Sequence, residues 1–304
     1  MATSNIFTYN GTLQNPAPPN LPIAPTAYQQ QYQDQVLNAL RLYFNQLNNA
    51  VGGLIASSSN PVIVNNESPY SLPSYLQVAR GLVPGVSEVN IYGYQGSVAG
   101  TFIPVWENAT AYTYPVSATT MLLYSSSASD TAVSVLINGL DSNYNIQTET
   151  LVCTGTTGVT TTKSYLRING ITVTGTNNAV GTLYLSNAGK TVTYAQITAG
   201  YGKSQAMIYT VPNGYTFYLT RSNGYGQLSG GSNNFINYRV WTQSSAGLIQ
   251  ILLQVPFTNT YQTLRVAPRP YAAKTDIQWQ CNANTNTAAV GIGVEGILIA
   301  NGTV

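Results

Sequence analysis

Few residues in this 304-residue sequence could carry covalent chemistry. It has no histidine, nine Asp and Glu residues and two cysteines. Without histidine the commonest general base and metal ligand is missing, and with it the Ser-His-Asp and Cys-His arrangements and the usual zinc sites. We therefore predict that the protein is not an enzyme and uses no metal and no organic cofactor.

Carboxylate pairs are the remaining candidates for acid–base chemistry, because a glycosidase needs two carboxylates across one cleft. Glu107 with Asp276, and Asp141 with Glu149, are the pairs to consider. No substrate-cleft pattern accompanies them, which favours structural roles. The segment from Asp141 to Asn145 also has oxygen ligands at alternate positions, as in a calcium loop. Asp and Asn favour turns by bonding to their own backbone, and we prefer the turn.

The segment Gly291-Ile-Gly293-Val-Glu-Gly296 has the glycine spacing of a dinucleotide-binding loop. Such a loop must open a helix, whereas this segment continues into the apolar sequence ILIANGTV. We expect these glycines to let a last strand pack closely against its neighbour. The cysteines, Cys153 and Cys281, each lie in a predicted strand; Cys281 is expected to be buried, and the sequence leaves their pairing open.

Charged residues make up only 7% of the sequence, against roughly 25% in an average soluble domain. The net charge is +2 and the basic residues are scattered, so we expect no nucleic-acid partner. No apolar run approaches about 18 residues, so we expect no membrane span. The first 14 residues lack the basic and apolar regions of a secretion signal. The 23 tyrosines suit subunit interfaces or sugar-binding faces, although burial is the default for most of them.

One long helix is predicted, over about residues 28–55, with its end at Gly52 and Gly53. Apolar residues recur there at alternating steps of four and three, which is the seam of a coiled coil. We expect self-association through Val36, Leu40, Tyr43, Leu47 and Leu54. The alternative is an amphipathic helix packed on its own domain.

The segment before the helix, residues 1–27, is rich in proline and has no charge, so it is predicted to be an extended anchoring arm. Its apolar residues Ile6, Phe7, Leu13 and Ile23 are expected to dock on another protein. A terminus that contacts nothing is the alternative. Residues 28–60 are assigned to the coiled-coil helix, and residues 61–95 to a linker with a first strand at 86–94.

From residue 96 to 304 the sequence is predicted to be mainly β. Short Tyr-, Thr-, Val- and Ile-rich runs alternate with turns such as Asn169-Gly170 and Asn213-Gly214. We predict an antiparallel β-sandwich head of jelly-roll type, as one unit or as two subdomains divided near 222–234. Together with the arm and the helix, this predicts a trimeric protein with a β-sandwich head.

Three passages carry a resemblance: VPGVSEVNIYGY (83–94), GLDSNYNIQTETL (139–151) with GTTGVTTTKSYLRING (155–170), and AMIYTVPNGYTFYLT (206–220). They are similar to virion structural proteins of tailed bacteriophages, in which a β-domain with a GLD…ETL turn and a YTVP-x-G strand pair is common. The likeness covers roughly residues 80–225. Residues 1–60 resemble the attachment ends of trimeric head fibres and decoration proteins in style only.

The resemblance implies a non-enzymatic, oligomeric protein that is assembled into the virion in the host cytoplasm. We expect a capsid-attached head fibre or decoration protein, a homotrimer whose partners are itself and phage capsid or tail proteins. The alternative is a tail-side fibre or receptor-binding protein that adheres to a host surface glycan. The sequence does not place such a glycan site.

Overall fold

The computed structural model describes residues 30–56, 73–98, 100–228, 234–284 and 288–302. The chain divides into two compact units, Met1–Leu72 and Pro73–Val304, and each is described by itself. The predicted docking residues Ile6, Phe7, Leu13 and Ile23 lie outside the described residues.

The first unit contains α1 (Gln30–Ala56), the long helix predicted from the sequence. It runs through Gly52 and Gly53, where the sequence predicts its end, and its 27 residues span about 40 Å. Within residues 30–47, where side chains are described, none is buried. Among the described residues, no helix has both the length and the apolar character needed to cross a membrane.

The second unit contains one short helix, α2 (Ser74–Ala79), and sixteen strands. The strands are β1 (Val86–Val98), β2 (Ile103–Pro104), β3 (Leu122–Ser125), β4 (Ser134–Leu140), β5 (Ile146–Val152), β6 (Val159–Thr160), β7 (Arg167–Thr174), β8 (Leu183–Ser186), β9 (Thr193–Ile197), β10 (Ile208–Thr210), β11 (Tyr215–Gln227), β12 (Ile236–Gln243), β13 (Ile249–Phe257), β14 (Thr260–Tyr271), β15 (Asp276–Ala283) and β16 (Ala288–Ala300).

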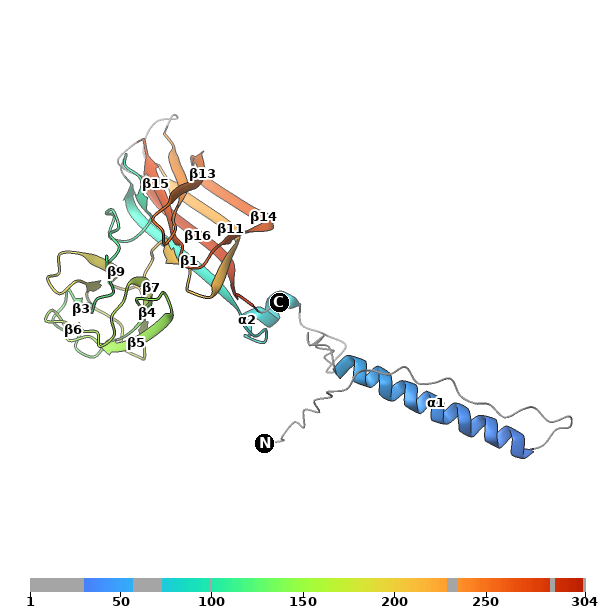
Figure 1. Cartoon of the computed structure of the whole chain (residues 1–304). Helices are drawn as coiled ribbons and strands as arrows, with labels where there is room; N and C mark the ends of the chain where they lie inside the picture. The colour runs from blue at the N-terminus through green and yellow to red at the C-terminus, as the bar shows by residue number, and fades with distance from the viewer. Residues whose placement is uncertain (1–29, 57–72, 99, 229–233, 285–287, 303–304) are drawn as a thin grey trace. The chain divides into compact units, whose positions relative to one another are not determined.

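These strands form four antiparallel sheets. Sheet 1 has the order β1-β16-β11-β14, and sheet 2 has the order β10-β15-β12-β13 with β2 added on β15. Sheet 3 has the order β6-β3-β8-β9, and sheet 4 has the order β5-β4-β7. Figure 1 shows the long strands of sheet 1 lying side by side, with β3–β9 gathered in a separate group.

The predicted jelly-roll sandwich with a coiled-coil helix is wrong. The protein is mainly β, with 52% strand and 10% helix, but its strands form four small antiparallel sheets in a four-bladed, propeller-like ring. Alternation of apolar and polar residues predicts strands and their buried faces, but it does not specify how many sheets they form. The observed fold includes no coiled coil either, since α1 is the one helix among the described residues of the first unit.

The buried side chains of the second unit form two hydrophobic cores. The first core takes its buried side chains from sheets 1 and 2, including Phe217, Trp279 and Ile292. The second core takes its buried side chains from sheets 3 and 4, including Leu123 and Ile137. The second core is therefore an insertion, because its strands β3–β9 all fall between β2 and β10 in the chain.

The division between the cores does not fall at residues 222–234. Phe217 and Leu219 precede this stretch and Tyr238 follows it, yet all three belong to the first core. Strand β11 also continues through its beginning, to Gln227. The Gly- and Ser-rich composition of this stretch therefore does not mark a boundary between cores.

The predicted turn at Asn169-Gly170 is instead a bulge within β7. Asn138 of β4 pairs with Gly170 while Gly139 pairs with Ile168, so Asn169 is the extra residue. A bulge re-aims a side chain, and the Asn169 side chain is directed at β10. Its Nδ2 donates to the Thr210 carbonyl at 2.9 Å, and its Oδ1 accepts from the Thr210 N–H at 2.8 Å. The bulge thus joins sheet 4 to sheet 2.

A buried ion pair lies beside this contact. Arg167 of β7 donates from Nε to Asp276 Oδ1 at 2.8 Å and from Nη2 to Oδ2 at 2.9 Å. The Thr210 hydroxyl also donates to Asp276 Oδ1, at 2.6 Å. The paired side chains are 11% and 4% exposed. Such a bidentate pair fixes orientation as well as distance, so it sets how the two cores meet.

The rest of the Arg167 guanidinium is also satisfied. Its Nη1 donates to the carbonyls of Leu166 at 2.8 Å and Pro115 at 3.2 Å. Its Cζ lies 4.6 Å from the centre of the Tyr114 ring. Burial alone would lower the pKa of Arg167, but the hydrogen bonds and charge of Asp276 raise it above its usual value. The guanidinium is therefore held charged at the junction.

We predict that Arg167→Met destabilises the protein by about 3–5 kcal/mol, because it leaves the Asp276 carboxylate buried without its cation. Urea unfolding followed by circular dichroism measures the change. Arg221→Met is the matched control: its ion pair with Glu295 is 3.5 Å long and the two side chains are 40% and 50% exposed, so it should cost no more than about 1 kcal/mol. Equal losses for the two variants would contradict the role given to Arg167.

Candidate functional site

The outer face of sheet 1 carries three rows of residues that cross its strands. The pairings run from β1 through β16 and β11 to β14, and they give the rows Asn90, Glu295, Arg221 and Leu264; Tyr92, Gly293, Asn223 and Gln262; and Tyr94, Gly291, Tyr225 and Thr260. Each row is polar or aromatic except at its glycine or at Leu264. Because β1 alternates, Asn90 and Tyr92 project to the same side.

Two glycines of β16 form the floor between these side chains. A Cβ on Gly291 would lie 2.8 Å from the Tyr92 hydroxyl, and one on Gly293 would lie 2.7 Å from Asn223 Oδ1. The glycines therefore make room for the Tyr92 and Asn223 side chains to lie over β16. The expectation that they serve close packing in a last strand, and do not open a helix, is confirmed.

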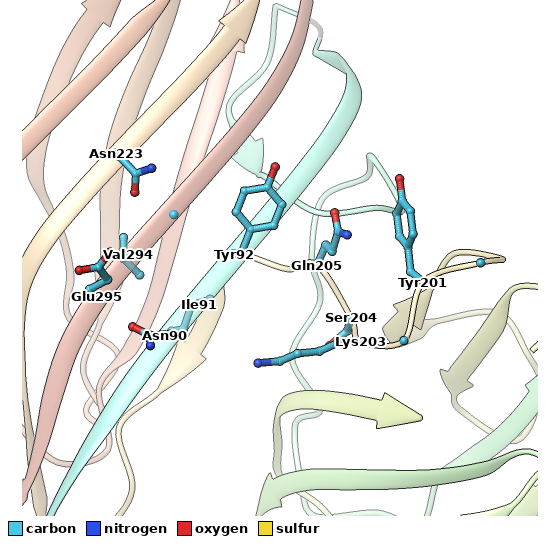
Figure 2. A pocket seen from close by; sticks show the side chains of 13 residues that line it. Asn90, Ile91, Tyr92, Tyr201, Lys203, Ser204, Gln205, Asn223, Val294 and Glu295 are labelled. Carbon is cyan, nitrogen blue, oxygen red and sulfur yellow. The ribbon is translucent and has the colours of Figure 1, made fainter. Parts of the chain in front are cut away.

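The loop between β9 and β10 faces this floor. It contributes Tyr201, Lys203, Ser204 and Gln205 to a hollow of about 720 Å³. Figure 2 shows Tyr92 on its strand and Tyr201 on the loop, with the Gln205 side chain between the two rings in this view. The hollow is thus lined by sheet 1 on one side and by the chain that returns from the second core on the other.

Glu107 holds this loop in place. Its Oε2 accepts from the Thr198 N–H at 2.5 Å and its Oε1 accepts from the Gln205 N–H at 2.6 Å. Burial raises the pKa of Glu107, and the hydrogen bonds from Thr198 and Gln205 offset that rise only in part. Ser204 anchors the loop a second time, because its Oγ accepts from the Ile171 N–H at 3.1 Å.

Several polar groups in the hollow have no partner among the described residues. The hydroxyls of Tyr92 and Tyr201 and the side-chain amides of Asn223 and Gln205, which line the hollow, make no hydrogen bond with them. Tyr92 is 51% exposed and Tyr201 is 40% exposed. Partial burial, and next the nearby Tyr94 and Tyr201, raise the pKa of Tyr92. Its hydroxyl therefore stays protonated and available as a donor at neutral pH.

A second hollow, of about 500 Å³, continues from the first along β1. The two share Asn90, Ile91 and Lys203, and the second extends past Glu88 to Asn138 and other residues of β4. Together they form one elongated depression, which we call the β1 groove. It follows β1 from Tyr92 back to Glu88, with the second core on its other side.

The β1 groove has little net charge. Its charged side chains are Lys203, Glu88 and Glu295. Glu88 accepts a hydrogen bond from Asn90 Nδ2 at 2.8 Å, and Glu295 is paired with Arg221 at 3.5 Å. The groove therefore offers mainly hydroxyl and amide groups, beside the faces of two tyrosine rings.

The carboxylate pairs considered from the sequence have other roles. Glu107 anchors the 198–205 loop and Asp276 binds Arg167. Glu149 Oε1 accepts from the Thr162 N–H at 2.8 Å. Asp141 Oδ1 accepts from the N–H groups of Asn143 and Asn145 at 2.8 and 2.9 Å, which confirms the predicted turn. The described residues contain no cluster of three or more His, Cys, Asp or Glu that could hold a metal ion.

The two cysteines belong to different cores and are both free. The predicted burial of Cys281 is confirmed, and burial raises its pKa. The thiol of Cys153 is buried in the second core, where its pKa is raised as well. Neither thiol is placed to react with a ligand in the β1 groove.

Of the residues predicted for self-association, Val36, Leu40 and Tyr43 are half-buried in α1 and Leu47 is exposed. Leu54 lies in the same helix, and its side chain is outside the described part. Sequence reasoning did not place the β1 groove. Alternation in VSEVNIYGY does put Tyr92 with Asn90 on one face, but nothing in the sequence indicates that Tyr201 faces them. No known protein-family model matches this sequence, and no curated protein is similar to it.

We predict that Glu107→Ala loosens the 198–205 loop without unfolding the protein, because it removes the acceptors of two backbone N–H groups. Hydrogen exchange at the Thr198 and Gln205 amides should become about tenfold faster or more. Glu149→Ala is the control, since Glu149 accepts from the N–H groups of Thr162 and Lys163 in another loop. Unchanged exchange at Thr198 and Gln205 in Glu107→Ala would refute the anchoring role.

Proposed function

We propose that this protein is a non-enzymatic structural protein of a tailed-bacteriophage virion, attached to the capsid and self-associated through α1. The observation that carries the proposal is the apolar surface of this helix. Leu37 and Leu42 are each 62% exposed and Phe44 is 60% exposed. An exposed set of large apolar side chains on one helix is typical of an interaction site.

Copies of the same helix are the partner that fits this surface best. Val36, Leu40, Tyr43, Leu47 and Leu54 recur along one side of the helix, which suits association of parallel copies. Leu37, Leu42 and Phe44 widen the apolar surface beyond what one neighbour would cover. This supports an assembly of three chains.

The phage assignment is supported by the resemblance of residues 83–94, 139–170 and 206–220 to phage virion proteins. Within these passages, Asp141 caps the turn after β4, and β10 leads through a turn into β11. The proposed capsid attachment belongs to the arm, with Ile6, Phe7, Leu13 and Ile23 as its docking residues. The proposed localisation of the protein is the virion, after assembly in the host cytoplasm.

A tail-side fibre or receptor-binding protein is the second candidate. The β1 groove favours it, because a protein that only covers a capsid has no need of an open groove with unpaired hydrogen-bonding groups. The two candidates share the arm and the self-associating helix. They differ in what the second unit contacts outside the particle.

We predict that the double variant Leu40→Asp, Leu47→Asp is a folded monomer, because two buried carboxylates per chain would disrupt the association of α1. Sedimentation-velocity ultracentrifugation measures the mass. The matched control is Asn38→Asp, Asn45→Asp, which adds the same charge to exposed positions of the helix and should leave the oligomer intact. A double Leu variant with the mass of the unaltered protein would remove the case for α1.

A truncated chain without residues 1–25 should still form the oligomer, because α1 is intact, but should no longer join virions. Co-sedimentation of the truncated and full-length chains with phage particles that lack this protein measures attachment. Ile6→Asp with Phe7→Asp in the full chain should have the same effect. Normal attachment of both altered chains would contradict a docking role for the arm.

A further inference from the structure

We infer that the β1 groove is a binding site for a neutral oligosaccharide. The proposal depends on Tyr92 and Tyr201, which line one open hollow from the strand and from the loop, together with the Asn223 and Gln205 side chains that line it as well (Figure 2). It deepens the receptor-binding candidate by naming a site and a class of ligand. It does not depend on self-association of α1, because the groove lies within the second unit.

The aromatic and polar groups of the groove match the two kinds of surface on a pyranose. A sugar ring presents C–H groups on its faces and hydroxyls around its edge. The partly exposed side chains of Tyr92 and Tyr201 suit the C–H groups, since tyrosine combines an apolar ring with a polar tip. The unpaired amides of Asn223 and Gln205 each offer a donor and an acceptor, which is what a sugar hydroxyl requires.

The charges in the groove favour a neutral ligand. Glu88 and Glu295 line it together with one cation, Lys203. A sialylated or uronic-acid glycan would bring its carboxylate near these two carboxylates, and nucleic-acid phosphates would need a run of basic side chains. A neutral sugar meets neither obstacle. Lys203 then serves as one more donor, near Asn90 where the two hollows join.

The length of the groove favours a chain of sugars over a single ring. The hollow at Tyr92 and Tyr201 continues into the one beside Glu88 and Asn138 through the shared residues Asn90 and Lys203. The hollow at Tyr92 and Tyr201 alone has a volume of about 720 Å³, which is in the range of ligand sites, about 300–1,000 Å³. A linear oligosaccharide would place one ring in the hollow that Tyr92 and Tyr201 line and extend along β1.

The geometry favours binding over hydrolysis. Two carboxylates lie on the groove, but each is engaged: Glu88 by Asn90 and Glu295 by Arg221. A glycosidase needs one protonated and one free carboxylate on either side of the scissile bond. The groove has its carboxylates on adjacent strands of one sheet face, with Asn90 and Glu295 directly paired. They therefore lie on one side of the ligand.

The test is binding of the full chain to an array of immobilised neutral and anionic glycans. The mass of the protein in the same samples is measured by ultracentrifugation. We expect binding to neutral glycans and about a tenfold loss with Tyr92→Ala or Tyr201→Ala. Tyr225→Ala is the matched control: Tyr225 is 60% exposed on the same sheet face but does not line the groove, so binding should be unchanged. Asn223→Ala should weaken binding without removing a ring.

Each other outcome has a defined meaning. No binding to any neutral glycan, binding that survives both tyrosine substitutions, or binding confined to anionic glycans would overturn the inference. Release of reducing sugar from a bound glycan would overturn it as well, because it requires catalysis. The mass of the samples reports separately on α1: a monomer that binds glycan through Tyr92 refutes the proposed assembly and leaves the sugar site standing.

Discussion

The structure of the second unit depends on the ion pair between Arg167 and Asp276. The two hydrophobic cores take their buried side chains from different pairs of sheets, so contacts outside both cores set the angle at which they meet. A bidentate pair, flanked by the Asn169 bulge on Thr210, supplies that angle. A buried pair of this kind costs desolvation and adds little net stability. Its value here is orientation, because only one geometry satisfies all of its donors and acceptors at once.

The β1 groove follows from this junction. Its floor belongs to sheet 1, while its facing loop returns from the second core and is fixed by Glu107 and Ser204. If the cores met at another angle, Tyr92 and Tyr201 would no longer line one hollow. The side chains on the floor are also held in advance, since Gly291 and Gly293 leave space that Tyr92 and Asn223 occupy. A groove fixed in this way loses little conformational freedom when a ligand enters.

The sequence predicted the local structure better than the arrangement of the sheets. Apolar residues at steps of four and three were sufficient for the long helix, and alternation with turn residues was sufficient for the mainly β character. They failed where residues distant in the chain decide the outcome: Asn169-Gly170 is typical of a turn, yet β4 continues the pairing on both sides and makes it a bulge. The β1 groove could not be predicted from the sequence for the same reason. Tyr92 and Tyr201 are 109 positions apart by their numbering, and the junction of the cores brings the loop of Tyr201 to the strand of Tyr92.

The low charge of the chain connects these features. Where charged side chains occur in the second unit, several are used to fix backbone or to join the cores, as with Glu107, Glu149 and Asp276. The amides and hydroxyls of the chain can contact a neutral partner without the desolvation cost of an ion. A surface of such groups gives up electrostatic steering, so its encounters are slower than those of charged partners. The proposed virion assembly would offset that loss, because many weak neutral contacts act together when several copies are held close to one another.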